Sequence, residues 1–217
     1  MHGSGDMSPG GGADVVALLR RLNSIIEARV GDISVFNSGC TEGELGQVER
    51  TLQVDLPGDY KSLLRSVNGQ PDDCELRFPP DQLRFLSVEG VLSLWRNHLQ
   101  FQSDEFFDEL TSDEKVRGTP FHPRRIPIAE YEDGGAYLWI DYIPGPAGRV
   151  GQIIFNFNEI DFAVLEDSVT DLFRRYVTIL ETGAASLAEA PPDYGDGYRF
   201  MVSDQYMDFA AYHDLRT

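Results

Sequence analysis

The sequence predicts an α+β fold, in which helices pack mainly against one side of a twisted antiparallel sheet. Three runs of β-branched and aromatic residues, at 126–131, 136–143 and 150–157, follow one another with only turns between them. Apolar residues recur at the helical period in four stretches before these runs and in one stretch after them. Consecutive strands flanked by helices are typical of the α+β class.

The first helices are predicted from apolar spacing and from capping residues. Residues 13–30 carry a single apolar stripe at the 3.6-residue period. Thr41 and Glu44 form a capping box, which predicts a second helix that runs to about residue 53. Pro57 suits the first turn of a third helix, and Asn68-Gly69 is typical of a left-handed end.

The middle of the chain is less regular. Residues 70–86 hold three prolines and no sustained period, so we expect a loop with room for a short strand. Residues 88–101 return to helical spacing, and the acidic stretch 103–115 is typical of a solvated helix and turn.

The strand runs predict an antiparallel meander. Glu132-Asp133-Gly134-Gly135 is a tight hairpin connection, and residues 144–149 form a longer turn shaped by proline and glycine. Alternation places Leu138 and Ile140 on one face, with Tyr137, Trp139 and Asp141 on the other. A short strand at 162–165 and a helix capped by Ser168 and ended by Gly183 complete the predicted domain.

The composition divides the chain into three parts. Residues 1–12 read as a flexible lead, residues 13–183 as one domain, and residues 184–217 as an extension packed on that domain. The lead has neither a basic start nor an apolar core, so it does not resemble a secretory signal. Cys40 and Cys74 lie in no metal-type spacing, which favours a reduced, cytoplasmic setting; a single disulfide between them stays open as an alternative.

The charge balance points to a class of partner. The chain has 36 acidic and 18 basic residues, a formal net charge of −18. This balance argues against nucleic-acid binding, which needs a basic surface, and against docking on an anionic membrane. A positively charged protein partner is favoured instead, because long-range attraction speeds its encounter with an acidic body.

The search for catalytic motifs finds none, so we expect no enzyme activity, no cofactor and no metal. His98 and His122 lie among apolar neighbours and are interpreted as packed or capping residues. Asp193 and Asp196 are candidate calcium ligands, but their spacing fits no EF-hand loop. A hydrolase that uses acids in a sheet cleft remains an alternative, which would require a pocket with a perturbed carboxylate.

The sheet segment combines acids with aromatic residues. Nine acids and one arginine, Arg149, lie between Ile126 and Asp171, beside tyrosines and a tryptophan of the kind that anchor interfaces. Two interpretations stay open: an acidic-aromatic binding face, or core aromatics beside solvated acids. The first predicts these partner-binding residues: Tyr131, Glu132, Asp133, Tyr137, Trp139, Asp141, Asp72, Asp73 and Glu75.

The order of several short motifs resembles the SUKH superfamily, over roughly residues 40–183. The matching segments are Leu56-Pro57-Gly58-Asp59-Tyr60, Asn68-Gly69-Gln70, Arg125-Ile126-Pro127-Ile128-Ala129 with Gly134-Gly135, and Asp141-Tyr142-Ile143-Pro144-Gly145-Pro146-Ala147-Gly148 leading to Gly151-Gln152. The chain departs from the family pattern at Asn156-Phe157-Asn158 and at Glu132-Asp133. These positions lie in the part that members use for partners, so partner identity does not carry over.

The resemblance implies a binding module without catalysis. The superfamily includes the yeast cell-wall-synthesis regulator and bacterial immunity proteins that neutralise toxins. The leading hypothesis is an immunity protein that covers the active site of a cognate intracellular toxin, basic and nucleic-acid-modifying, with an acidic face. The alternative is a regulatory or scaffolding module that binds a signalling or cell-envelope enzyme.

Overall fold

The computed structural model describes residues 11–102, 113–119, 121–132, 134–157, 160–191 and 195–215. Asp133, Asp193 and the stretch 103–112 therefore lie outside the described residues. The helices are α1 (Gly11–Val30), α2 (Glu42–Leu52), α3 (Gly58–Ser66), α4 (Val88–His98) with a short 3-10 turn η1 (Leu99–Phe101), α5 (Val169–Glu181) and α6 (Phe209–Asp214). The strands are β1 (Arg84–Phe85), β2 (Arg125–Glu130), β3 (Ala136–Asp141), β4 (Gln152–Phe157), β5 (Ile160–Glu166), β6 (Ser186–Glu189), β7 (Tyr198–Val202) and β8 (Gln205–Tyr206).

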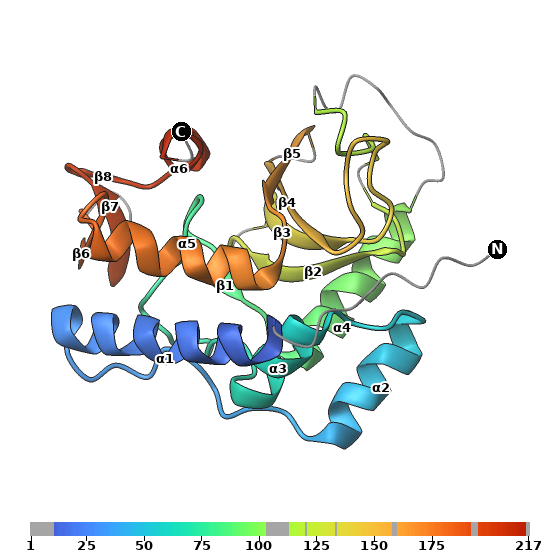
Figure 1. Cartoon of the computed structure of the whole chain (residues 1–217), viewed down its shortest axis with the longest axis horizontal. Coiled ribbons are helices and arrows are strands. Elements are labelled where there is room, and N and C mark those ends of the chain that lie inside the picture. The colour runs from blue at the N-terminus through green and yellow to red at the C-terminus, as the bar shows by residue number, and fades with distance from the viewer. Residues whose placement is uncertain are drawn as a thin grey trace.

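The predicted meander is confirmed. Strands β1 to β5 form one antiparallel sheet in sequence order, and β6, β7 and β8 form a second, smaller antiparallel sheet (Figure 1). The α+β class and the packing of helices on one face are confirmed as well. The capping box at Thr41 and Glu44 is present, and the Ser168 side chain accepts a hydrogen bond from the Asp171 amide at the start of α5.

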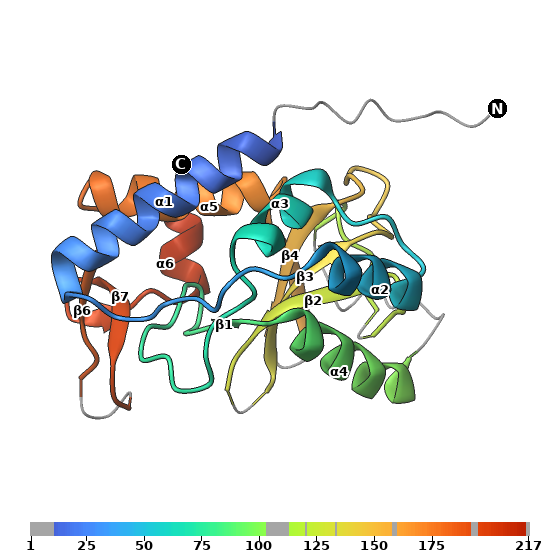
Figure 2. The same ribbon diagram turned by 90° about the horizontal axis from the view of Figure 1, so that it is seen from below.

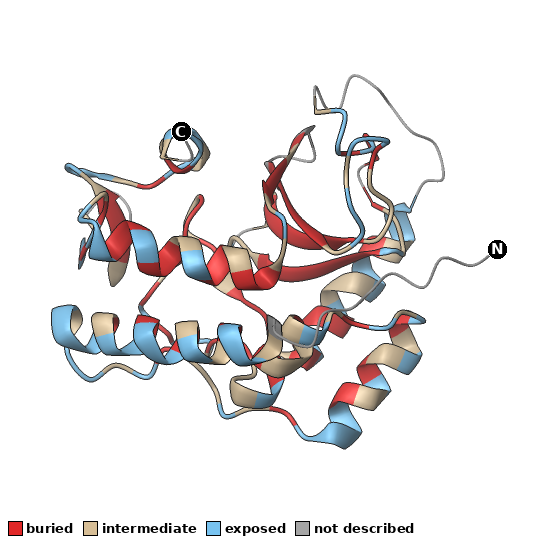
Figure 3. Cartoon of the chain, viewed as in Figure 1, coloured by how far each residue is buried: buried red, intermediate tan, exposed pale blue. Residues whose placement is uncertain are grey.

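One face of the large sheet forms the main hydrophobic core. Leu138, Ile140 and Phe155 point from β3 and β4 into a cluster that also contains α1, α3 and α5. The three helices contribute, among others, Leu22, Leu63 and Leu172. Figure 3 shows the result: the strands of the large sheet are buried almost throughout, while the outward faces of the helices are exposed.

The other face of the large sheet is also covered. Tyr137, Trp139 and Ile154 form a second cluster with residues of the segment 113–121 and of β5. This segment carries no regular secondary structure over its described residues, and it contributes Val116 and Phe121. Aromatic residues on both faces of the sheet are therefore core residues.

The turn between β3 and β4 holds the covering segment in place through its backbone. The amide of Gly145 donates to the Lys115 carbonyl at 2.8 Å, and the side-chain amide of Gln152 donates to the same oxygen at 2.8 Å. A Cβ atom on Gly148 would lie 2.2 Å from that oxygen. The Pro-Gly-Pro-x-Gly turn thus fits against residues 114–115, which explains its glycines physically.

A second motif ties the loop after α3 to the sheet. The side chain of Gln70 accepts from the Phe85 amide at 2.9 Å, and its backbone amide donates to the Phe85 carbonyl at 2.9 Å. Gly69 has φ +66°, and a Cβ there would lie 2.3 Å from the Ser87 nitrogen. Gln70 therefore occupies the open edge of β1, and only glycine fits the position before it.

The last residues of the chain pack onto the domain. The ring of Phe200 lies 5.7 Å from that of Phe78, and the ring of Phe209 stacks on Phe155 at 5.3 Å. The Tyr212 hydroxyl donates to Glu166 at 3.2 Å. The boundary predicted at residue 183 stays a prediction.

Candidate protein-binding site

Three segments that are far apart in the sequence carry exposed acids at one edge of the molecule. They are the loop after α3, the hairpin between β2 and β3, and the residues that precede β7, which lie side by side along the lower edge of Figure 2. We call their exposed carboxylates the acidic rim, which consists of Asp72, Asp73, Glu75, Glu132 and Asp196. Four of these five residues were predicted from the sequence.

Two arginines hold the three segments of the acidic rim together. Arg77 donates from its amide to the Tyr198 carbonyl at 3.1 Å, and its guanidinium pairs with Glu132 at 3.1 Å. Arg84 pairs with Asp72 at 2.5 Å and with Glu130 at 3.4 Å. These arginines stabilise the rim but also neutralise part of its charge.

The carboxylates of the rim reach into solvent. The side chain of Asp72 is fully exposed and that of Glu132 is 69% exposed. Asp73 and Glu75 are exposed, and neither takes part in an ion pair among the described residues. Exposed charges of this kind contribute little to the stability of the fold. They act mainly on the rate at which a charged partner associates.

Half-buried tyrosines supply the aromatic component of this site. Tyr131 and Tyr198 pack partly against the main core. Tyr131 directly precedes the rim residue Glu132, and Tyr198 is the first residue of β7, two positions after the rim residue Asp196. Tyr198 also donates from its amide to the Glu75 carbonyl at 2.8 Å. Tyrosine in a half-buried position is typical of an interface anchor, because little conformational entropy remains to be lost.

The predicted roles of Tyr137 and Trp139 as contact residues are wrong. Tyr137 is 8% exposed and Trp139 is 1% exposed, because residues of segment 113–121 and the end of α4 cover them. The Trp139 ring lies 4.9 Å from His98 and its indole nitrogen donates to Asn156 at 2.6 Å. The alternative interpretation, that these rings belong to the core, holds here.

The predicted contact role of Asp141 is wrong as well. Its side chain is fully buried and pairs with the equally buried Arg125 at 3.5 Å. It also accepts from the Ile143 amide and from the Gln152 side chain, each at 3.0 Å. Burial lowers the pKa of Arg125, and the nearby Asp141 carboxylate opposes that shift. Removing either partner would leave a buried charge without its counterion.

The other acids of the sheet segment do not form a face. Glu130, Glu166, Asp167 and Asp171 pair with arginines from four different positions, and Asp133 lies outside the described residues. The prediction of an acidic sheet face is therefore replaced by that of an acidic edge. This edge is formed by loops that are distant in the sequence and touch in the structure. The order of residues along the chain does not show such contacts. Asp196 was missed for this reason.

The histidines fit the packing roles predicted for them. His98 is 8% exposed and stacks on Phe121 at 4.4 Å, and burial lowers its pKa to about 4. His122 accepts from the Arg124 amide at 3.1 Å. Among the described residues no group of three or more His, Cys, Asp or Glu side chains is placed to hold a metal ion. Both cysteines are free and buried, so the alternative disulfide is not formed.

No helix within the described ranges is long and apolar enough to cross a membrane.

Comparison with known proteins gives a family match and a named relative. The model of the SMI1 / KNR4 family (SUKH-1) matches residues 39–175. The cell wall assembly regulator SMI1 of Saccharomyces cerevisiae (strain ATCC 204508 / S288c) is 25% identical over an alignment of 197 residues that covers 73% of this chain. The chain spans only 39% of the length of that relative.

Proposed function

Because the chain belongs to the SMI1 / KNR4 (SUKH-1) family, we propose that it is a non-catalytic protein-binding module whose acidic rim meets a basic protein. The observation that carries the proposal is the rim itself. Exposed carboxylates from three segments lie beside the half-buried Tyr131 and Tyr198. The arginines Arg77 and Arg84 fix the segments to one another. Aromatic anchors within a charged edge are the arrangement expected of a specific interface.

The kind of partner follows from charge. A chain with a net charge of −18 attracts a basic protein over distances of about one Debye length, roughly 8 Å at physiological salt. A standard interface would bury about 1,600 Å² in total, with the tyrosines giving affinity and the carboxylates giving speed of association. Glu132, Asp72, Asp73 and Glu75 are the residues proposed to face the partner, with Tyr131 as the anchor.

Within this class we propose an immunity protein that neutralises a cognate intracellular toxin. In this mechanism the acidic rim covers the basic cleft in which the toxin binds its substrate, so that binding and inhibition are the same event. A basic cleft of this kind suits a nucleic-acid-modifying toxin, since phosphate binding requires positive charge.

The second candidate is a regulatory module, which the named relative favours. That relative is a cell wall assembly regulator, and its sequence aligns with 73% of this chain. A regulator would bind an enzyme of the host without abolishing a toxic activity. Gene neighbourhood separates the two candidates, because an adjacent toxin gene favours immunity and an isolated gene favours regulation.

The test is a binding measurement with a charge-reversed rim. The tagged chain captures its partner from a lysate of the native host, and the partner is then purified and its binding measured. We expect the variant Asp73→Lys/Glu75→Lys to associate at least about tenfold more slowly, because it inverts two steering charges. The matched control Glu114→Lys/Asp204→Lys makes the same charge change at exposed positions elsewhere.

The binding data test the rim, and the toxicity of the partner separates the two candidate functions. Equal binding by the rim variant and the control variant would contradict a partner site at the rim. Expression of the partner alone then separates the candidates: growth arrest that the wild-type chain relieves and the rim variant does not supports immunity. A partner without toxicity supports the regulatory candidate.

A further inference from the structure

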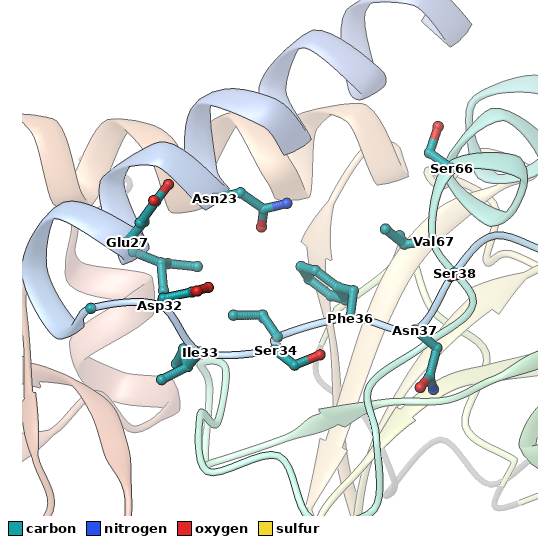
Figure 4. A pocket seen from close by; sticks show the side chains of 13 residues that line it. Asn23, Glu27, Asp32, Ile33, Ser34, Phe36, Asn37, Ser38, Ser66 and Val67 are labelled. Atoms are coloured by element: carbon teal, nitrogen blue, oxygen red, sulfur yellow. The ribbon is translucent and has the colours of Figure 1, made fainter.

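A cavity of about 390 Å³ lies between the second half of α1, the segment 31–38 that follows it, and the end of α3 (Figure 4). Volumes of this size are at the lower end of those that hold small ligands or single side chains. Most of its lining precedes residue 39, where the family match begins, and only Ser66 and Val67 come from the matched region. The cavity therefore belongs to the part of this chain that its N-terminal helix adds.

Negative charge in the cavity is not compensated by its walls. Glu27 and Asp32 are its only charged lining residues, and neither forms an ion pair within the described part of the chain. Two of the three arginines of α1 are engaged with α5: Arg21 pairs with Glu181, and Arg29 donates to the Leu180 carbonyl at 2.9 Å. The third, Arg20, is exposed and does not line the cavity. The end of the 20-residue helix α1 adds partial negative charge at the same place.

Two of the neutral polar residues of the lining, Asn37 and Ser66, donate from their side chains within the protein. The side-chain nitrogen of Asn37 donates to the Asn68 carbonyl at 3.2 Å, and its amide donates to the Gly69 carbonyl at 2.9 Å. The Ser66 hydroxyl donates to the Ser62 carbonyl at 3.1 Å. The side-chain oxygens of Asn37 and Ser66 can still accept, and Asn23, Ser34 and Ser38 add further acceptors together with donors.

The base of the cavity is apolar. Ile26 is 1% exposed and Val35 is 7% exposed, and the half-buried Phe36 and Val67 complete this surface. Figure 4 shows Asp32 and Asn23 projecting into the space between α1 and the segment below it. A ligand that fits both parts has a hydrocarbon stem, which contacts the base, and a cationic head with several N–H donors.

We propose that this cavity receives the basic side chain, arginine or lysine, of a protein partner, with Glu27 and Asp32 as the countercharges. The proposal rests on the protein-binding function proposed above. It adds a second contact beside the acidic rim, because the carbonyl of the lining residue Val35 accepts from the Cys74 thiol at 3.6 Å, between Asp73 and Glu75. The head of the side chain donates to the carboxylates and to the acceptors around them, while its methylene stem covers Ile26 and Phe36.

The experiment uses a small probe in place of the partner. A negative result with this probe would contradict the cavity proposal and would leave the proposed role of the rim unaffected. The ¹⁵N-labelled full chain is titrated with N-acetyl-arginine methylamide and observed by NMR. The neutral isostere N-acetyl-citrulline methylamide serves as the ligand control. We expect saturable shifts at residues 23–38, 66 and 67, with a dissociation constant of about 1 mM or somewhat above, as suits one side chain.

Variants link the binding to the two carboxylates. Glu27→Gln/Asp32→Asn should bind the arginine derivative at least tenfold more weakly, whereas the control Glu114→Gln/Asp204→Asn, with the same charge change, should bind as the wild type does. Thermal unfolding of each variant checks the fold. Asp32 and Glu27 are exposed, so neither substitution removes a core contact.

Four results would overturn the proposal. They are an absence of saturable shifts at the lining residues, equal shifts with the citrulline derivative, unchanged affinity in the Glu27→Gln/Asp32→Asn variant, and tenfold tighter binding of a free diamine. The last result would assign the cavity to a small polyamine instead of a protein side chain.

Discussion

Replacing Gly148 by alanine tests how the sheet's second face is covered. The Cβ of Gly148→Ala would lie 2.2 Å from the Lys115 carbonyl oxygen and 2.9 Å from Pro144 Cβ. The nearest atom belongs to the backbone, so the substitution cannot be accommodated by rotating a flexible side chain. No positive φ is needed at this position, and the expected effect is therefore one of packing alone.

The magnitude follows from the contacts that must change. Overpacking of this kind costs about 1–3 kcal/mol. Displacing residue 115 also weakens the hydrogen bonds from Gly145 and Gln152 to its carbonyl, each about 0.5–1.5 kcal/mol. We expect a total loss of about 3 kcal/mol in the free energy of unfolding, which corresponds to a fall of about 6–12 °C in Tm for a chain of this size.

The assay is urea unfolding followed by tryptophan fluorescence, in which Trp139, beneath the covering segment, and the half-buried Trp95 are the reporters. Gly43→Ala is the control: Gly43 is exposed in the first turn of α2, and its Cβ would have only Thr41 Oγ1 within 4 Å, at 3.8 Å. Alanine has the higher helix propensity, so this variant should be at least as stable as the wild type. If Gly148→Ala were as stable as the wild type, the fit of the turn against residues 114–115 would be refuted.

Three further substitutions test buried groups. Trp139→Ala should lower the free energy of unfolding by about 3–5 kcal/mol in urea titrations, since the ring is a core residue; a loss of binding without a loss of stability would place it at an interface. Burial, and to a lesser extent the nearby Asp208, raises the pKa of Asp81 to about 6. Between about pH 4 and about pH 6 the carboxyl is therefore protonated in the folded chain but ionised in the unfolded chain, so the free energy of unfolding falls as pH rises through this range. Asp81→Asn should flatten this slope and stabilise the chain at pH 7, and an unchanged unfolding profile would contradict the shift. Burial lowers the pKa of His98 to about 4, so its contribution is lost as pH falls from about 6.5 to about 4; His98→Phe, which keeps the ring stacking, should remove that acid-side loss in thermal unfolding scans.

The sequence predicts the regular elements well, because each depends on local spacing. The stripe over residues 13–30, the capping box at Thr41 and the alternation along 136–141 all correspond to observed elements. The small sheet and α6 were not predicted. Ser186–Glu189 shows no apolar alternation, and α6 has only six residues, so neither carries a periodic signal.

The candidate site was predicted only in part, for a physical reason. Alternation separates the two faces of a strand but does not say what covers each face. Segment 113–121 has no periodic pattern, and so the burial of Trp139 beneath it was not foreseeable from spacing. The acids at 72–75 and at Glu132 were identified, yet their proximity depends on Arg77, which links two loops far apart in the sequence.

The measurement that tests the central claim most directly is the rate of association between the chain and its purified partner at different salt concentrations. Between about 10 and about 150 mM salt the Debye length falls from about 30 to about 8 Å. If the acidic rim steers binding, the wild-type association rate should fall at least about tenfold across this range, while the dissociation rate changes less. The variant Asp73→Lys/Glu75→Lys should lose most of this dependence. A wild-type rate that does not change with salt, or a rim variant with the same dependence as the wild type, would contradict the proposed role of the rim.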